Sequence, residues 1–354
     1  MSSLDEYAEK LTSPDETVRT YAAEDLGYLN VPAAVAPLLS RLPVETSAAV
    51  RMAIFQALIR IDSDQTIAGA IQLLSNEETQ IRNLAVGLLQ RKNDRAIPFL
   101  KKAMHEGGRD TRKLVLDALS GIQHTSIAEI YAAALSDEDP NVVITAVENL
   151  GNLRAAQFAS AIEALLKDHS HPMLAAACLE ALAVMGNPSS LLAIKRCFPK
   201  ITELPQFFFT PCLKVLAALG GEIEFQELLD LLPPTTPQRY PAILSNLLTL
   251  HDRFGHQRIA LPDPNPKVLT LLKSLVDSNE PAACRYLAVR VLGFWVQRDD
   301  VSASLVSCLT NLERFVRIGA AEALRASNRS EFDSLLASHE AQESHDEVHQ
   351  ALIR

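Results

Sequence analysis

The sequence predicts an all-α protein, a right-handed α-α superhelix of about eleven helix pairs. One observation is a short motif that recurs at a regular interval along nearly the whole chain. Another is composition: hydrophobic residues make up 48% of the 354 residues but aromatic residues only 5%, and alanine and leucine carry most of the apolar content. That balance favours closely packed helices over a β-sandwich, which would need more β-branched and aromatic residues.

The recurring motif has the period of a helical solenoid. It reads VRTYAAEDLG from Val18 and VRIGAAEALR from Val316. Adjacent copies begin about 30 to 34 residues apart, except for one gap of about 44 residues, and this spacing is typical of two-helix repeats. The copies begin at Val18, Val50, Ile81, Thr111, Val142, Leu174, Phe208, Tyr240, Cys284, Val316 and Val348.

Each copy is expected to be the second helix of a pair. In the fifth pair, apolar residues recur at helical spacing over residues 127–135 and again over 142–150. The segment SDEDPN between them can end the first helix and cap the second, because Asp and Ser oxygens accept free amide hydrogens. One pair cannot bury its apolar side alone, so neighbouring pairs must stack on one another.

A column of small residues, four places after seven of the eleven starts, would let successive second helices approach closely. Two cysteines fall in the same column, where a thiol acts as a small apolar residue. The column contains Ala22, Ala85, Ala146, Ala288, Ala320, Cys178 and Cys212.

The segments SPDETVRTYAAEDLG, SDEDPNVVITAVENLG and LERFVRIGAAEAL resemble the HEAT repeat, especially the short bacterial form seen in the phycobilisome lyase family. This resemblance implies a ladder in which an arginine of one pair contacts an acidic residue of the next. Val143, Ala175, Phe209 and Pro241 stand at the ladder position in the middle pairs, where we expect an interruption. The ladder arginines would be Arg19, Arg51, Arg82, Arg112, Arg285 and Arg317.

Departures from the repeat are the places where function is expected. Residues 1–250 are predicted to hold pairs one to eight, residues 251–266 a Pro-rich insertion, and residues 267–354 pairs nine to eleven of the same array. Arg253, His256 and Arg258 of the insertion are candidate partner-binding residues, although a tolerated surface loop would look the same. Phe207 begins a run of three phenylalanines that one narrow helical stripe cannot bury, so it is a candidate binding anchor, with core packing as the alternative.

An acidic column is a further candidate. Asp117, Glu148 and Glu180 lie six places after the starts of their copies, on helices expected to line the concave side. They could receive a basic or amphipathic segment of a protein partner through complementary charge. The alternative is an ordinary solvated face.

Other classes of function are disfavoured by composition and motifs. A net charge of −10 argues against nucleic-acid binding, which needs a basic stripe. We find no secretory signal pattern, no apolar stretch of membrane-span length and five scattered cysteines, so a cytoplasmic protein with reduced thiols is expected. No nucleotide-binding, metalloprotease or hydrolase motif is present, and we predict no catalytic residue, cofactor or metal site.

The sequence therefore favours a non-catalytic scaffold or adaptor that binds a protein partner through its concave face. The alternative is a phycobilin-lyase-like or other protein-modifying accessory enzyme, which rests on the family resemblance alone. The oligomeric state is not indicated.

Overall fold

The computed structural model describes residues 3–166, 171–254, 261, 263–327 and 329–353. Across these residues it contains 22 α-helices, seven short 3-10 turns and no β-strand. First and second helices alternate along the chain, giving eleven of each. The all-α prediction and the expected number of helix pairs are confirmed.

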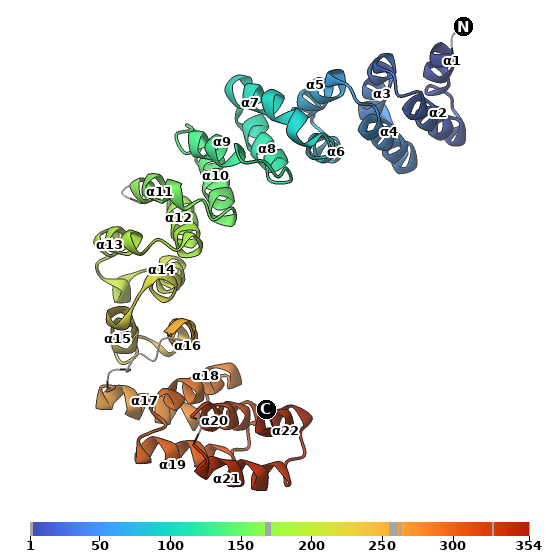
Figure 1. The fold of residues 1–354 in the computed structure, drawn as a ribbon. Helices are drawn as coiled ribbons and strands as arrows, with labels where there is room; N and C mark the ends of the chain where they lie inside the picture. Colours follow the sequence, from blue (N-terminus) through green and yellow to red (C-terminus); the bar gives the residue numbers. More distant parts are fainter. Residues whose placement is uncertain (1–2, 167–170, 255–260, 262, 328, 354) are drawn as a thin grey trace. The chain divides into compact units, whose positions relative to one another are not determined.

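The chain forms two compact units, residues 1–162 and 163–354. In the first unit, even-numbered helices pack in sequence (α2 on α4, α4 on α6, α6 on α8, α8 on α10) and odd-numbered helices form the other layer (Figure 1). The helices are α1 (Ser3–Lys10), α2 (Glu16–Leu29), α3 (Val35–Arg41), α4 (Ala48–Arg60), α5 (Asp64–Leu73), α6 (Thr79–Arg91), α7 (Ile97–Glu106), α8 (Arg109–Leu119), α9 (Ile127–Ala134) and α10 (Pro140–Asn152), with α11 (Ala159–Leu165) running across the division.

The second unit repeats this construction. Its even-numbered helices pack in sequence from α12 to α22, and each odd-numbered helix from α13 onward packs on the helix that follows it. The helices are α12 (Pro172–Met185), α13 (Pro188–Cys197), α14 (Gln206–Leu219), α15 (Glu222–Leu231), α16 (Tyr240–Phe254), α17 (Pro266–Val276), α18 (Ala282–Leu292), α19 (Asp299–Cys308), α20 (Arg314–Ala326), α21 (Glu331–Glu340) and α22 (Asp346–Ile353).

Side chains in the turns cap the beginning of several second helices, as the sequence predicts. The Asp15 carboxylate accepts a hydrogen bond from the Thr17 amide at 2.7 Å and caps α2. Asp139 caps α10 through the Asn141 amide, and Ser47 caps α4 through the Val50 amide. These side chains satisfy amide groups that the first helical turn leaves without a partner.

The column of small residues is buried, as predicted. Cys178 and Cys212 are both fully covered, and burial raises the pKa of each thiol to about 12, so both stay protonated and behave as small apolar residues. Two second helices approach closely at Gly27, where a Cβ would lie 2.8 Å from the Cα of Ala57. Any larger residue there would force α2 and α4 apart.

The predicted insertion is partly helical, because α16 continues to Phe254 and α17 begins at Pro266. The partition of the chain around residues 251–266 stays a prediction. Within the described residues, no helix combines the length and apolar character needed to span a bilayer.

Candidate functional site: the face of the second helices

The arginine ladder forms at four of its six predicted positions. In each case a guanidinium on one second helix contacts a carboxylate in the turn before the next second helix, and the shortest contacts are 2.6–2.8 Å. At these four positions the ladder couples one helix pair to the pair that follows. The contacts are Arg19–Glu45, Arg51–Glu78, Arg112–Asp137 and Arg317–Glu343.

Among the residues that the structure describes, the other two arginines have no carboxylate partner, and the sequence explains why. Arg82 donates to the carbonyls of Asn76 and Glu77 in its own pair, since the turn before α8 contains Gly107 and Gly108 instead of an acid. Arg285 donates to Asn311 Oδ1 at 3.2 Å, an amide standing where the other turns place a carboxylate.

Glu45 is the most enclosed charge of the ladder, with a fully covered side chain. Arg19 and Arg41 both contact its Oε2, and the Ser47 amide donates to Oε1 at 2.8 Å. Burial alone would raise the pKa of Glu45, but the hydrogen bonds from Arg19, Ser47 and Arg41 outweigh it and lower the pKa to about 2. This network is structural, because it leaves the carboxylate no open position for a ligand.

The three residues of the predicted acidic column differ in their surroundings. Glu148 on α10 is exposed, with no ion pair in the described part of the chain. Asp117 on α8 is half-buried, and burial raises its pKa while Lys113 partly opposes the shift. Glu180, in the second unit, contacts Lys214 on α14 at 2.7 Å, so its charge is already compensated. A continuous acidic column stays a prediction.

The three consecutive phenylalanines divide between surface and core. Phe207 is 44% exposed and meets Phe208 edge to face at a centroid distance of 5.3 Å. Phe209 is fully buried, and the Arg239 guanidinium lies 4.3 Å from its ring centroid. Phe207 is thus the member available to a partner, whereas its neighbours support the second unit.

Arg253, predicted as part of the insertion, lies in the last turn of α16. Its Nη1 donates to the carbonyl of Ala217 at 2.6 Å and to that of Gly220 at 3.3 Å, at the end of α14. These contacts satisfy carbonyls that the end of a helix leaves without a partner. His256 and Arg258 lie outside the described residues, so the binding role predicted for this region stays a prediction.

An exposed apolar surface on α2 and α4 was not anticipated. Tyr21, Tyr28 and Met52 are 62%, 70% and 50% exposed. Glu24 lies between the two tyrosines on the same stripe of α2, and the Arg60 guanidinium lies 4.4 Å from the Tyr28 ring centroid. We call these five residues the α2–α4 surface. Its signal in the sequence was two tyrosines seven residues apart, outside the buried stripe of the repeat.

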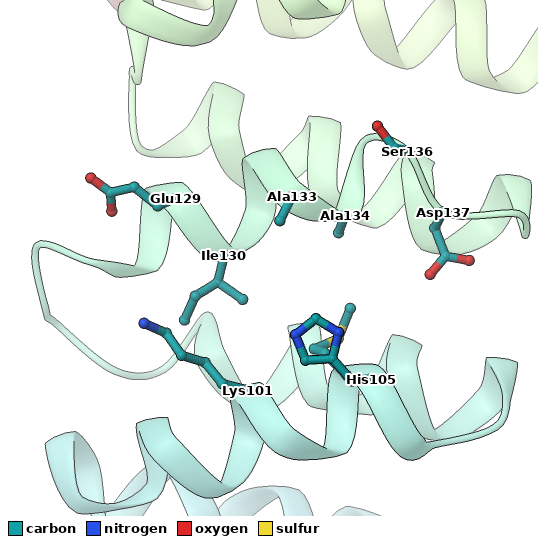
Figure 2. Close-up of a pocket in the computed structure, with 9 residues that line it drawn as sticks. Lys101, His105, Glu129, Ile130, Ala133, Ala134, Ser136 and Asp137 are labelled. Carbon is teal, nitrogen blue, oxygen red and sulfur yellow. The ribbon is translucent and has the colours of Figure 1, made fainter.

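A cavity of about 400 Å³ opens on the other layer of the first unit, between α7 and α9. Lys101 and His105 of α7 face Ile130 and neighbouring alanines of α9 across it (Figure 2). Ser136 and Asp137 also line the cavity, but Ser136 points away from His105, and Asp137 is bound to Arg112. The cavity therefore contains serine, histidine and aspartate without the hydrogen-bonded relay that nucleophilic catalysis requires.

A second cavity, of about 540 Å³, lies on the second helices α18, α20 and α22. Beside it, Tyr286 donates to Glu322 Oε2 at 2.8 Å and Arg290 donates to the same oxygen at 2.5 Å. Tyr286 and Arg290 of α18 thus share the carboxylate of Glu322 on α20, which joins these two helices.

Comparison with known proteins supports this architecture. The family model described as HEAT repeats matches residues 4–90. Solved structures of Kap121p bound to the extreme C-terminus of the phosphatase Cdc14p and of Kap121p bound to Pho4p share 16% identity with the chain, at TM-scores of 0.53 and 0.54. Each match covers 99% of this chain and 45% of the Kap121p chain. The fold is that of a HEAT-repeat solenoid.

A structure of Kap95p with RanGDP gives the same result at a TM-score of 0.55 and 13% identity, covering all of this chain and 56% of its own. The chain therefore spans about half the length of these karyopherins, and the likeness shows the fold alone. No curated protein matches. The resemblance to the phycobilisome lyase family is not supported. The sequence likeness comes from the two-helix motif, which specifies a fold and no chemistry.

Proposed function

We propose that this HEAT-repeat solenoid is a non-catalytic scaffold that binds a protein partner through the face of its second helices in the first unit, the side predicted to be concave. The observation that carries the proposal is the α2–α4 surface. Tyr, Met and Arg are enriched in the cores and hot spots of protein interfaces, and here these three residue types lie on two helices that pack on each other.

Charge on the same layer supports a basic or amphipathic partner. Glu24 and Glu148 are exposed on α2 and α10, and Asp117 is half-buried on α8 between them in the sequence. Arg60 is stacked on Tyr28, and Glu24 is the one acidic group of the α2–α4 surface. The match to structures of Kap121p bound to Cdc14p and to Pho4p supports a protein-binding use of the fold in general.

The test is photo-crosslinking from two matched positions. Gln56 is exposed on α4 beside the α2–α4 surface, and Gln72 is exposed on α5, in the other layer. With a photoreactive amino acid at either site, we expect a specific protein adduct from position 56 and little or none from position 72 in cells that produce the protein. Equal adducts from both sites, or adducts from position 72 alone, would contradict binding through the second helices.

A further inference from the structure

The cavity of the first unit lies between two first helices that hardly contact each other. In this layer α3 packs on α5 and α5 packs on α7, but α7 and α9 barely touch. Residues 120–126 connect α8 to α9, whereas only residues 61–63 connect α4 to α5. On α9, Ala133 and Ala134 are too short to fill the gap, which leaves an opening of about 400 Å³ (Figure 2). A volume of this size is typical of sites for small ligands.

The middle of this cavity is apolar. Ile130 and Ala134 are 7% and 4% exposed, and with Met104 of α7 and Ala133 of α9 they line it. A hydrocarbon group placed here leaves water and contacts all four side chains, and it fills space that a close-packed interior does not leave open. The lining therefore favours a ligand with an apolar part.

The α7 side of the cavity carries two donors without acceptors. Lys101 and His105 lie one turn apart on α7, and both face the cavity (Figure 2). Neither makes a hydrogen bond or ion pair with another residue that the structure describes. An ammonium group and an imidazole N–H are donors that a carboxylate accepts, and the charge of the lysine strengthens the bond.

Two carboxylates also line the cavity, and both lie on the α9 side. Asp137 is held by Arg112 at 2.8 Å, which compensates its charge. The carboxylate of Glu129 points away from Ile130 and the alanines (Figure 2). An anion is therefore stabilised beside α7, where Lys101 and His105 face it, and Glu129 opposes it from a distance.

We propose that the cavity between α7 and α9 binds a small carboxylic acid with a hydrocarbon part, such as a medium-chain fatty acid. The carboxylate accepts hydrogen bonds from Lys101 and His105, and the hydrocarbon part lies against Met104, Ile130 and Ala134. This site belongs to the first helices, whereas the α2–α4 surface belongs to the second helices. It therefore goes beyond the proposed function, because one chain can bind a small ligand and a protein partner on separate layers.

The probe is octanoate, and its control is octanamide, which has the same chain without the charge. Carbon-13-labelled methionine methyl groups report binding to the full chain by NMR, because Met104 lines the cavity and Met173 is exposed on α12. Met104→Leu and Met173→Leu identify the two resonances. We expect octanoate to shift the Met104 resonance and leave that of Met173 in place. Octanamide should bind about fivefold more weakly, the size of effect that one exposed ion pair gives.

Charge variants of the chain test the carboxylate contact. Lys101→Gln should weaken octanoate about fivefold and leave octanamide unchanged, because removing either charge removes the same contact. Glu129→Gln should strengthen octanoate about twofold, since it removes a nearby like charge. Lys102→Gln, at a side chain that is 71% exposed and outside the cavity, is the matched control and should change neither ligand.

A filled cavity tests the apolar contact. Ala133 is exposed, so the larger side chain of Ala133→Leu can enter the cavity without disturbing the core. We expect this variant to weaken octanoate and octanamide alike by about tenfold, because the leucine occupies the space of the hydrocarbon chain. Circular dichroism checks that the variant keeps its helices.

The inference is overturned if octanoate leaves the Met104 resonance in place, shifts Met104 and Met173 equally, or binds no better than octanamide. An equal effect of Lys101→Gln and Lys102→Gln, or unchanged binding to Ala133→Leu, would overturn it as well. None of these results bears on crosslinking from position 56, which tests the proposed function separately.

Discussion

The first unit and the middle of the second unit join neighbouring helix pairs in different ways. In the first unit, Arg112 reaches forward to the carboxylate of Asp137, as Arg19 does to Glu45. In the second unit, Arg253 reaches back to backbone carbonyls at the end of α14. Both contacts bind a guanidinium, the first through a carboxylate, which titrates, and the second through carbonyls, which do not. Stacking of neighbouring pairs therefore does not require one particular kind of contact. Its response to acid does depend on the kind of contact.

The largest effect is expected from Glu45→Gln, which keeps the shape of the side chain and removes its charge. Because Glu45 is fully covered, the change leaves two arginines without a charged partner, and we expect a loss of about 3 kcal/mol in the free energy of unfolding of α2 and α4. Hydrogen exchange of these helices in increasing urea measures it. Glu138→Gln, at a carboxylate that is 86% exposed, should cost less than about 0.5 kcal/mol. Similar losses in both variants would refute the special role of the buried pair.

Acidification should distinguish the carboxylate contacts of the first unit from the carbonyl contacts of Arg253. The pKa of Glu45 falls from 4.5 to about 2 on folding, so the unfolded chain takes up a proton at higher pH than the folded one. The stabilisation is fully present above pH 4.5 and is lost as the pH falls toward 2. Protection of α2 and α4 amides should therefore decrease over this window, and Glu45→Gln should remove that part of the decrease. The contact of Arg253 with carbonyls has no such dependence.

The smallest effect concerns His251 in the second unit. Its ring stacks on Phe294 at a centroid distance of 4.0 Å, and burial lowers its pKa, which Asp252 partly opposes and Arg290 reinforces. The unfolded chain then binds the proton first, so stability should be highest above about pH 6.5 and should decrease below it. Thermal melts of His251→Phe, which keeps the stack, should lack this decrease. An unchanged pH profile would show that His251 does not contribute.

Most of the fold could be predicted from the sequence, because helix pairs contact mainly their neighbours and the pattern repeats. The arginine ladder was predictable for the same reason. An arginine in one copy contacts the turn that lies about 26 residues later in the sequence. It fails at Arg82 because that turn holds Gly107 and Gly108. The pairing of Glu180 with Lys214 was also present in the sequence, since both occupy one column in adjacent copies.

The candidate site was less predictable, because exposure depends on what the neighbouring pair covers. The position of Tyr21 is buried at Thr145 and Gly319, and the repeat pattern alone assigns all three the same surroundings. Asp117 appeared solvent-facing in the pattern, yet it is half-buried. The cavity between α7 and α9 depends on how far two first helices separate, which no motif encodes.

The close approach at Gly27 has a consequence for how such an array can change over evolutionary time. Because the spacing between α2 and α4 is set by a missing side chain, even a single added methyl group must shift one module against the next. A substitution at this position would change how the two helix pairs lie against each other, while the exposed residues of both pairs stayed the same. A single substitution at Gly27 can thus change the spacing of α2 and α4 without altering any exposed residue.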